Sequence, residues 1–378
     1  MDLRFTEEQQ LLADSAAKFF EDAYDLPRRR ERVASEQGYS EELWSSMAEL
    51  GWLALRLPEK FGGFGMGAVE SALIMEAAGK SLAVEPLFNT GIIGATAITL
   101  GADDPLGEEL GPQLAAGECR VALAYAEPKS RYALNIVDTT ASKNGDSYVL
   151  SGAKAVVTHA PSAHKLIVSA RTSGDRSEAS GVTLFLVDAA SDGISMREYP
   201  TIDGLRAAEV ALDGVRPEAM LGDVDNGVEL LRAILDEAHV ALSAEAVGAM
   251  GYLLDSTVEY AKTRKQFDRP IGTFQVIQHR LVDMYNAVET ARGMTYYAAA
   301  GLATDDITAR TKIALQAKVK ASQGSKLVGE DSVQIHGGMG MTDELDIGHY
   351  FKRITMIAQT YGDVDYQLKQ LARLTRLS

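Results

Sequence analysis

Two segments of the sequence contain residue types that could hold a phosphorylated ligand. The first lies between 260 and 275 and carries Arg264, Phe267 and Gln275. Arginine offers planar donors and a permanent charge, which suit a pyrophosphate. The phenylalanine adds an aromatic face and the glutamine adds an amide. Basic residues are also common where a helix ends, because they interact favourably with its dipole. Taken alone, these residues leave both interpretations open.

The second segment has three glycines in four positions, Gly337, Gly338 and Gly340, shortly after Gln334. Glycine has no side chain, so a ligand or another chain can approach its backbone closely. A flexible loop between two helices would have the same composition, so this segment also has two interpretations.

Other familiar catalytic patterns do not occur in the sequence. The six histidines lack the spacing of a zinc site, and Cys119 is the only cysteine. We therefore expect neither a metal site nor an internal disulfide. There is no Gly-x-Ser-x-Gly segment of the kind that holds a nucleophilic serine. Nor does a Gly-x-Gly-x-x-Gly segment join a strand to a helix, as dinucleotide-binding Rossmann domains require.

Composition excludes several classes of protein. The 378 residues include 53 Asp and Glu against 37 Lys and Arg, for a net charge of −16. So acidic a surface repels nucleic acid and anionic membranes, and we expect no nucleic-acid partner. Apolar stretches such as 90–100 are too short to span a bilayer, so we expect no membrane insertion. The first residues do not have the pattern of a signal peptide, and with the single cysteine this predicts a cytoplasmic protein.

Proline usage and capping residues distinguish the helical parts of the chain from its middle. Seven of the ten prolines lie between Pro86 and Pro217, and proline is costly inside helices. In the first part, Thr6 and Gln9 have the spacing of a capping box, and Ser40 has the position of a helix N-cap. The first part is therefore expected to be helical.

Short β-rich segments separated by turn residues fill the middle of the chain, and helical periodicity returns after 223. Short strands at such spacing predict a compact antiparallel barrel or sandwich, and four long helices suit an antiparallel bundle. The predicted fold class is multi-domain α+β, with an N-terminal helical domain (1–119), a middle β-barrel domain (120–222) and a C-terminal four-helix bundle (223–378). The expected strands are 121–125, 148–150, 165–170, 182–187 and 209–212, and the expected long helices are 228–264, 274–302, 307–333 and 348–374.

The arginine-containing and glycine-containing segments together resemble the acyl-CoA dehydrogenase family. There, Arg-Lys-x-Phe-Gly-x-x-Ile-x-x-x-Gln and Gln-x-x-Gly-Gly-x-Gly hold the adenosine diphosphate half of FAD, partly across a subunit interface. The resemblance covers nearly the whole chain. It includes a Pro-Glu-x-x-Gly-Gly turn at 58–63, Glu127-Pro128 within a Thr-Glu-Pro strand, and a Gly-x-Arg segment at 204–206. It implies a helical domain, a β-barrel and a four-helix bundle.

The resemblance also implies FAD as the cofactor and assigns residues to it. The match weakens toward the flavin ring, where Val156 replaces a tryptophan and Ala126 replaces a threonine. A Gly-x-Gly-Ser loop is replaced by the bulkier 129–132, in which Arg131 could contact a phosphate or a distal carboxylate, or be a solvated surface charge. The residues that match the adenosine side are Arg264, Phe267, Gln275, Gln334, Gly337 and Gly338, and Thr158 matches the hydroxyl beside the ring.

The family reaction needs a carboxylate that removes the α-proton of an acyl-CoA thioester while the β-hydride passes to the flavin. Electrons then leave for an electron-transfer flavoprotein. At the family's two usual positions for this glutamate, the chain has Gly362 and Ala238. Asp363 and Glu237 are each one residue away and are the candidate bases, although Asp363 would also suit a helix N-cap and Glu237 a solvated helix charge. His239 is a candidate substrate contact.

The resemblance leaves two functions open. The chain is either a dehydrogenase with a relocated base, acting as the small subunit beside a homologous large subunit, or a non-catalytic partner. The partner would complete the FAD site and dimer interface of a catalytic homologue. Segments at 126–132, 206–210, 349–353 and 361–365 resemble the small subunits of pimeloyl-CoA dehydrogenases. Family resemblance suggests a medium-length or dicarboxylic acyl chain.

Overall fold

The computed structural model describes residues 4–145 and 147–376 of the chain. Contacts between residues divide it into two compact units. The first unit contains residues 1–30, 68–83 and 239–378, and the second contains residues 31–67 and 84–238. The N-terminal helices are therefore shared between the two units. The division into three consecutive domains stays a prediction.

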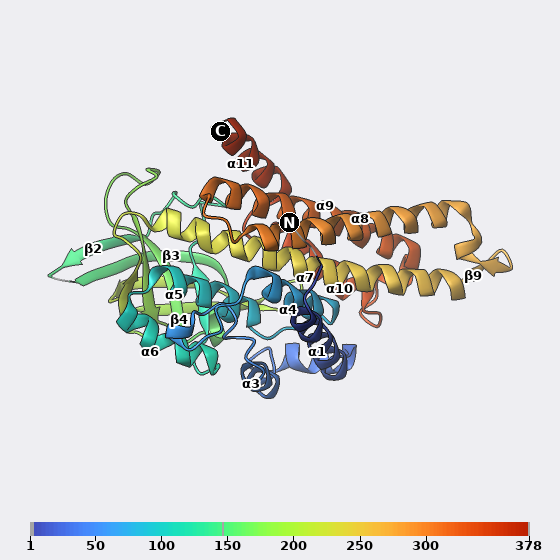
Figure 1. Cartoon of the computed structure of the whole chain (residues 1–378), viewed down its shortest axis with the longest axis horizontal. Helices are drawn as coiled ribbons and strands as arrows, with labels where there is room; N and C mark the ends of the chain where they lie inside the picture. Colours follow the sequence, from blue (N-terminus) through green and yellow to red (C-terminus); the bar gives the residue numbers. More distant parts are fainter. Residues whose placement is uncertain (1–3, 146, 377–378) are drawn as a thin grey trace. The chain divides into compact units, whose positions relative to one another are not determined.

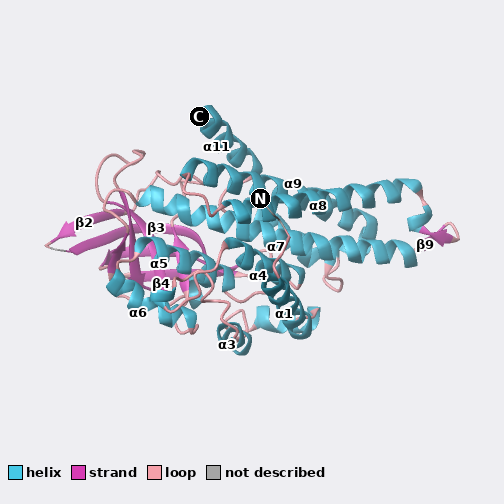
Figure 2. Ribbon diagram, viewed as in Figure 1, coloured by secondary structure: helices cyan, strands magenta, loops and turns pink. Residues whose placement is uncertain are grey.

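The second unit is built around one mixed sheet, drawn as magenta arrows in Figure 2. Among the described residues the sheet has eight strands, in the order β6-β7-β3-β2-β4-β5-β8 with β1 beside β4. Most neighbours are antiparallel, but β1 and β2 each pair with β4 in parallel. The sheet is thus mixed, whereas the sequence predicts an antiparallel one. The strands are β1 (Val121–Ala124), β2 (Thr140–Asn144), β3 (Ser147–Thr158), β4 (Lys165–Arg171), β5 (Val182–Asp188), β6 (Ile194–Pro200), β7 (Arg206–Val215) and β8 (Ala219–Leu221).

Three of these strands are not predicted by the sequence. Most side chains of β2 and β6 are exposed or only half-buried. The apolar alternation that indicates a strand is missing from β2, and in β6 it is limited to the half-buried Ile194 and Met196. The third, β8, has only three residues. All three are held by pairing with neighbours that pack into the core, where Leu150, Val168, Phe185 and Val210 are at most 1% exposed.

Short helices complete the second unit. The helix α3 (Glu41–Glu49) begins at Ser40, whose hydroxyl accepts the Leu43 N–H at 3.3 Å, which confirms the predicted N-cap. The expected turn at 58–63 is present. It requires Gly63, since a Cβ there would lie 2.2 Å from the Leu57 carbonyl oxygen. The other elements are η1 (Glu59–Phe61), η2 (Phe88–Gly94), α5 (Ala95–Gly101) and α6 (Asp104–Ala115), and α2 (Leu26–Ala34) spans the boundary between the units.

The first unit is helical, and its long helices run beside one another in Figure 1. It starts with α1 (Glu7–Ala23), where Thr6 and Gln9 form the predicted capping box. The helix α9 packs against α8, α10 and α11. No helix within residues 4–145 and 147–376 combines the length and apolar character needed to cross a bilayer. The helices are α4 (Ala68–Lys80), α7 (Gly227–Thr263, in this unit from His239 onward), α8 (Gln275–Gly301), α9 (Ile307–His336), α10 (Ile347–Gln359) and α11 (Val364–Arg376).

The last long helix expected from the sequence, over 348–374, is in fact two helices. The chain leaves α10 at Gln359 and re-enters a helix at Val364. Between them Tyr361 has φ 58° and Gly362 has φ 123°, values that end a right-handed helix. Asp363 then starts α11, because its carboxylate accepts the Tyr366 N–H at 2.8 Å. We refer to residues 360–363 as the α10–α11 break.

Two glycines allow α4 and α7 to cross with their backbones in contact. A Cβ on Gly248 would lie 1.9 Å from the Glu76 carbonyl oxygen, and a Cβ on Gly79 would lie 2.0 Å from that of Glu245. Neither carbonyl can move without disturbing its own helix, so any larger residue forces the helices apart.

We therefore predict that Gly248→Ala destabilises the protein by about 2–3 kcal/mol or more through overpacking. The matched control is Gly293→Ala in α8, where a Cβ would meet nothing within 4 Å. That change is expected to stabilise by ~0.5–1 kcal/mol, because alanine is the better helix former. Chemical denaturation of the two variants measures both effects, and a stabilising Gly248→Ala would contradict the close crossing.

Candidate cofactor and substrate sites

The two segments that match the adenosine side of an FAD site lie at the same end of the helical unit. The helix α7 ends at Thr263, and a short hairpin of β9 (Lys265–Gln266) and β10 (Arg269–Pro270) follows before α8. This hairpin is at the end of the bundle in Figure 1. The glycine segment forms η5 (Gly337–Met341) directly after α9. Tyr260 of α7 stacks on His336 of α9 with ring centroids 4.3 Å apart, which joins the two segments.

The hairpin presents its side chains to solvent. Phe267 and Asp268 both have positive φ, 52° and 62°, as the two central residues of a type I′ turn do. Phe267 is 87% exposed at the tip, and Arg264 and Gln275 are exposed on either side of the turn. In the part of the chain that the structure describes, the Arg264 guanidinium makes no ion pair.

The glycine segment is open in the same way. A Cβ on Gly337 or Gly338 would meet nothing within 4 Å, and Gly337 has φ 60°. Gln334, in the last turn of α9, is exposed. The exposed groups at this end of the bundle are therefore the Arg264 guanidinium, the Phe267 ring and the amides of Gln275 and Gln334. They lie near the backbone of 337–338, which a flat or charged group can approach. This arrangement fits the adenosine diphosphate part of a dinucleotide.

Thr158, the residue that matches the flavin-ring hydroxyl, lies at the end of β3 in the other unit. Asn89 Nδ2 donates to its carbonyl oxygen at 3.2 Å and lies 3.4 Å from its Oγ1. Two residues earlier, Val156 sits in a bulge with φ 53° and is 53% exposed. Positive φ is strained for a β-branched residue, and such strain is frequent at functional sites.

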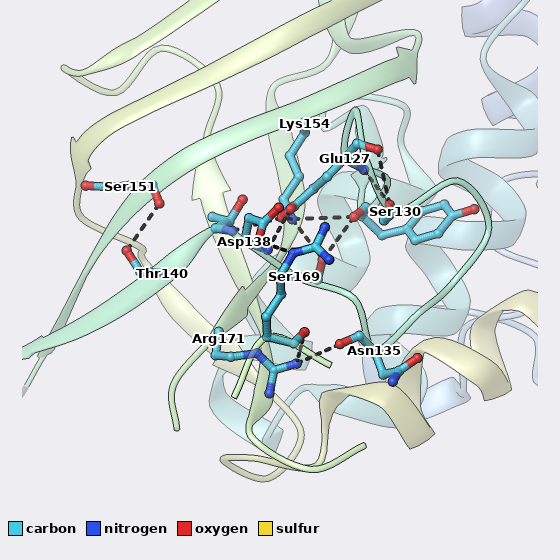
Figure 3. Close-up of polar contacts among 12 residues, drawn as sticks. Glu127, Ser130, Asn135, Asp138, Thr140, Ser151, Lys154, Ser169 and Arg171 are labelled. Carbon is cyan, nitrogen blue, oxygen red and sulfur yellow. Dashed lines mark hydrogen bonds and ion pairs between the residues drawn. The ribbon is translucent and has the colours of Figure 1, made fainter. Parts of the chain in front are cut away.

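A buried ion pair anchors the loop that follows β1, as Figure 3 shows. Lys154 Nζ lies 2.7 Å from Glu127 Oε1, and their side chains are 0% and 2% exposed. Glu127 also accepts the N–H groups of Asp138 at 2.6 Å and Thr139 at 3.0 Å. Burial raises the pKa of Glu127, but the Lys154 ammonium and these donors outweigh it and hold the pKa below its usual range. Sequence reasoning matched Glu127 to a motif but missed Lys154.

The loop anchored by this pair carries Arg131. Ser130 Oγ accepts the Glu127 N–H at 2.9 Å, and Arg171 donates to the Asn135 carbonyl at 2.7 Å, also in Figure 3. Arg131 itself is exposed and has φ 50°. The bulky loop is thus held at both ends, and it presents one guanidinium to solvent.

The two candidate bases are both engaged in contacts of their own. Glu237 Oε1 accepts from Arg56 Nη2 at 2.6 Å, with the side chains 12% and 16% exposed. Asp363 caps α11. Both of the family's usual positions are closely packed in this structure. Ala238 is fully buried, and a Cβ on Gly362 would lie 2.5 Å from Gln367 Nε2.

Three buried polar side chains surround the α10–α11 break, and we call them the carbonyl clamp: His239, Lys318 and Gln367. His239 is 4% exposed, and its Nε2 lies 3.3 Å from the Tyr361 carbonyl oxygen and 3.2 Å from Gln367 Nε2. Burial and the nearby Lys318 lower the pKa of His239 to about 3, so the ring is neutral at physiological pH. Sequence reasoning predicted His239 as a substrate contact and missed the other two members.

Comparison with known proteins identifies the family. Three models of acyl-CoA dehydrogenase domains match the chain: the N-terminal domain over 6–118, the middle domain over 122–215 and the C-terminal domain over 225–375. The probable acyl-CoA dehydrogenase YngJ of Bacillus subtilis is 30% identical over 99% of both chains. The chain belongs to the acyl-CoA dehydrogenase family. Its relatives are oxidoreductases that act on CH–CH bonds of acyl-CoA thioesters.

Solved structures of related chains have the same fold. The ChsE4–ChsE5 complex from Mycobacterium tuberculosis has a chain that is 26% identical, with a TM-score of 0.90 and full coverage of both chains. The FAD complex of PigA is 27% identical with a TM-score of 0.90, also over both full chains. The fold class expected from the sequence is confirmed, and FAD is the cofactor of the family. When bound, FAD supplies the acceptor for a hydride. The assignment of individual residues to it stays a prediction.

We predict that Glu127→Gln destabilises the protein by about 3–5 kcal/mol, because Lys154 is left buried without its carboxylate. Asp188→Asn is the matched control. Asp188 pairs with Lys165 at 3.0 Å but is 42% exposed, so its loss is expected to cost about 0–1 kcal/mol. Urea denaturation measures both, and equal effects would contradict the anchoring role of the buried pair.

Proposed function

We propose that this chain is the non-catalytic small subunit of a heteromeric FAD-dependent acyl-CoA dehydrogenase. In this proposal it completes the FAD site and the dimer interface of a homologous large subunit, which supplies the catalytic base. The reaction of the assembly is α,β-dehydrogenation of an acyl-CoA thioester. The observation that most strongly supports this proposal is that neither usual base position holds a carboxylate. Of the two adjacent carboxylates, Glu237 binds Arg56 and Asp363 caps the start of α11.

Proton abstraction places two requirements on a catalytic base. A catalytic carboxylate must reach the α-carbon and be free to accept its proton. A carboxylate held 2.6 Å from a guanidinium is stabilised in its charged form, and its oxygen is directed at that partner rather than at a substrate. An aspartate that caps a helix has its oxygen turned toward backbone N–H groups. Both candidates would have to give up a structural contact to act as the base.

The cofactor side supports the same proposal. Arg264, Phe267 and Gln275 are exposed around the hairpin, and Gln334 is exposed beside the open glycines. A family that shares the adenosine half of FAD across an interface needs these residues at the surface of each subunit. The structure of a related chain in the ChsE4–ChsE5 complex gives a precedent for assembly between different chains of this fold.

The substrate class and electron acceptor follow from the resemblance. The proposed substrate is a CoA thioester with a medium-length or dicarboxylic acyl chain, as in the pimeloyl-CoA dehydrogenases. The exposed guanidinium of Arg131 lies on an anchored loop and is the proposed contact for a phosphate or a distal carboxylate. An electron-transfer flavoprotein is the proposed acceptor, and the cytoplasm the proposed location.

The test is to purify the chain alone and after co-expression with a homologue that retains a Tyr-Glu-Gly segment near its C-terminus. We expect the lone chain to show no flavin bleaching when octanoyl-CoA or pimeloyl-CoA is added. The complex is expected to absorb near 450 nm and to bleach with one of the thioesters. Bleaching of the lone chain would overturn the proposal and make this chain the catalyst.

Asp363→Asn separates the two roles of that residue. Asparagine caps a helix about as well as aspartate, so we expect an intact fold and an unchanged bleaching rate in the complex. If Asp363 were the base, the loss of its carboxylate would slow the reaction by orders of magnitude while the fold stayed intact. The homologue's glutamate changed to glutamine is the positive control for loss of the base.

A further inference from the structure

Lys318 is a lysine at a fully buried position, which is unusual because burying a charged side chain costs free energy. Its side chain is fully buried in α9, and its Nζ lies 3.4 Å from Ser322 Oγ, 3.3 Å from the Ala358 carbonyl and 3.4 Å from the Gly362 carbonyl. None of these partners is a carboxylate. A buried charge without an opposite charge is expensive, and an apolar residue of similar size would usually be more stable.

The partners of Lys318 show what it does. A helix leaves its last carbonyl groups without intrahelical donors, and Ala358 lies in the last turn of α10. Gly362 belongs to the α10–α11 break. One amine on α9 therefore ties the end of α10 and the break to the middle of the bundle. An ammonium has three donors, and three acceptors lie within reach.

The rest of the carbonyl clamp acts on the same segment. Gln367 Nε2 donates to the Tyr361 carbonyl at 2.9 Å and lies 3.4 Å from that of Gly362. His239 Nε2, from α7, lies 3.3 Å from the Tyr361 carbonyl oxygen and 3.2 Å from the Gln367 amide nitrogen, from which it can accept a hydrogen bond. Tyr361 is a bulky residue at φ 58°, and such strained conformations persist only where the surroundings impose them. Three helices thus impose the conformation of this break through its carbonyls.

The charged and titratable groups that face Lys318 are few. His239 faces it from α7, and its neutral ring carries no charge near pH 7. Asp363, in the break, is the carboxylate whose charge favours the ammonium, but it also caps α11. Tyr361, also in the break, has a phenol whose pKa is raised by burial, so it is neutral as well. Burial is the largest effect on Lys318, and it lowers the pKa of the amine to about 7.

We propose that Lys318 is a positioning residue that holds the α10–α11 break in its strained form, and that opening of this break, apart from the rest of the bundle, is coupled to uptake of a proton by the Lys318 amine. The proposal goes beyond the proposed function and does not depend on it. The clamp itself depends on contacts within this chain.

The direction of the pH dependence follows from linkage. In the closed break the pKa of Lys318 is about 7, whereas an opened break exposes the amine to water and returns it to its ordinary value of 10.5. Between these values the open form binds more protons, so opening becomes less favourable as the pH rises. Protection of the break is therefore expected to rise from pH 7 upward, by at most ~10-fold per pH unit for one proton, and to be flat below pH 7.

Hydrogen–deuterium exchange of the full chain at pH 6, 7, 8 and 9, corrected for intrinsic exchange rates, tests this. We expect the protection of residues 359–367 to rise by roughly tenfold or more between pH 7 and 9. Residues 284–299 of α8, none of which hydrogen-bonds to Lys318, are the internal reference and are expected to lack this slope. A break without the slope, or a slope shared equally with α8, would overturn the proposal.

Lys318→Met removes the titrating group but keeps a side chain of similar length. We expect the slope in residues 359–367 to vanish, while the melting temperature at pH 7 stays the same or rises, since a buried charge has been removed. Lys320→Met is the matched control, because Lys320 is exposed on the same helix and the slope is expected to remain. A persisting slope in Lys318→Met would overturn the proposal. If that variant does not fold, the comparison of segments in the unmodified chain decides.

These measurements need neither flavin nor a second subunit. Their failure is therefore distinct from failure of the proposed function, which is read from flavin bleaching in the complex.

Discussion

A buried ammonium group must find oxygen atoms within reach, because no water is available to solvate it. This requirement shapes both units of the protein. In the sheet unit, Lys154 binds Glu127, and Glu127 in turn fixes the backbone at 138–139. In the helical unit, Lys318 binds the carbonyls of Ala358 and Gly362. In each case a lysine on a regular element determines the conformation of an irregular segment that matches a functional motif of the family.

Features set by neighbouring residues could be predicted from the sequence, and features set by distant residues could not. The capping box of Thr6 and Gln9 and the N-cap at Ser40 involve residues three apart, so their pattern is visible along the chain. The α10–α11 break depends on Lys318, which is 44 residues from Gly362. The same limit applies to the Arg56–Glu237 pair, whose members are 181 residues apart. Apolar periodicity is continuous through 348–374, so it predicts one helix where there are two.

The candidate site shows the same contrast. Resemblance to a family assigned the exposed residues around Arg264 and Gln334, because their motifs are contiguous. It did not predict that Tyr260 and His336 stack and bring the two motifs to one end of the bundle. For the acid–base chemistry, the sequence showed which carboxylates are missing. The structure confirmed the helix N-cap that the sequence offered as the alternative role of Asp363, and it alone showed that Glu237 is held by a guanidinium.

The exposed ring at the tip of the hairpin between α7 and α8 has a consequence for how the protein is produced in the cell. Phe267 is 87% exposed there, at a turn whose two central residues have positive φ, and its ring meets that of Phe274 edge-on with centroids 6.1 Å apart. Exposed apolar patches mark interaction sites or, when uncovered, aggregation liabilities, and Val276, Met339 and Met341 at this end of the bundle are exposed as well. Synthesis of this chain in amounts matched to those of the partner that covers the ring therefore limits the time for which the ring is exposed.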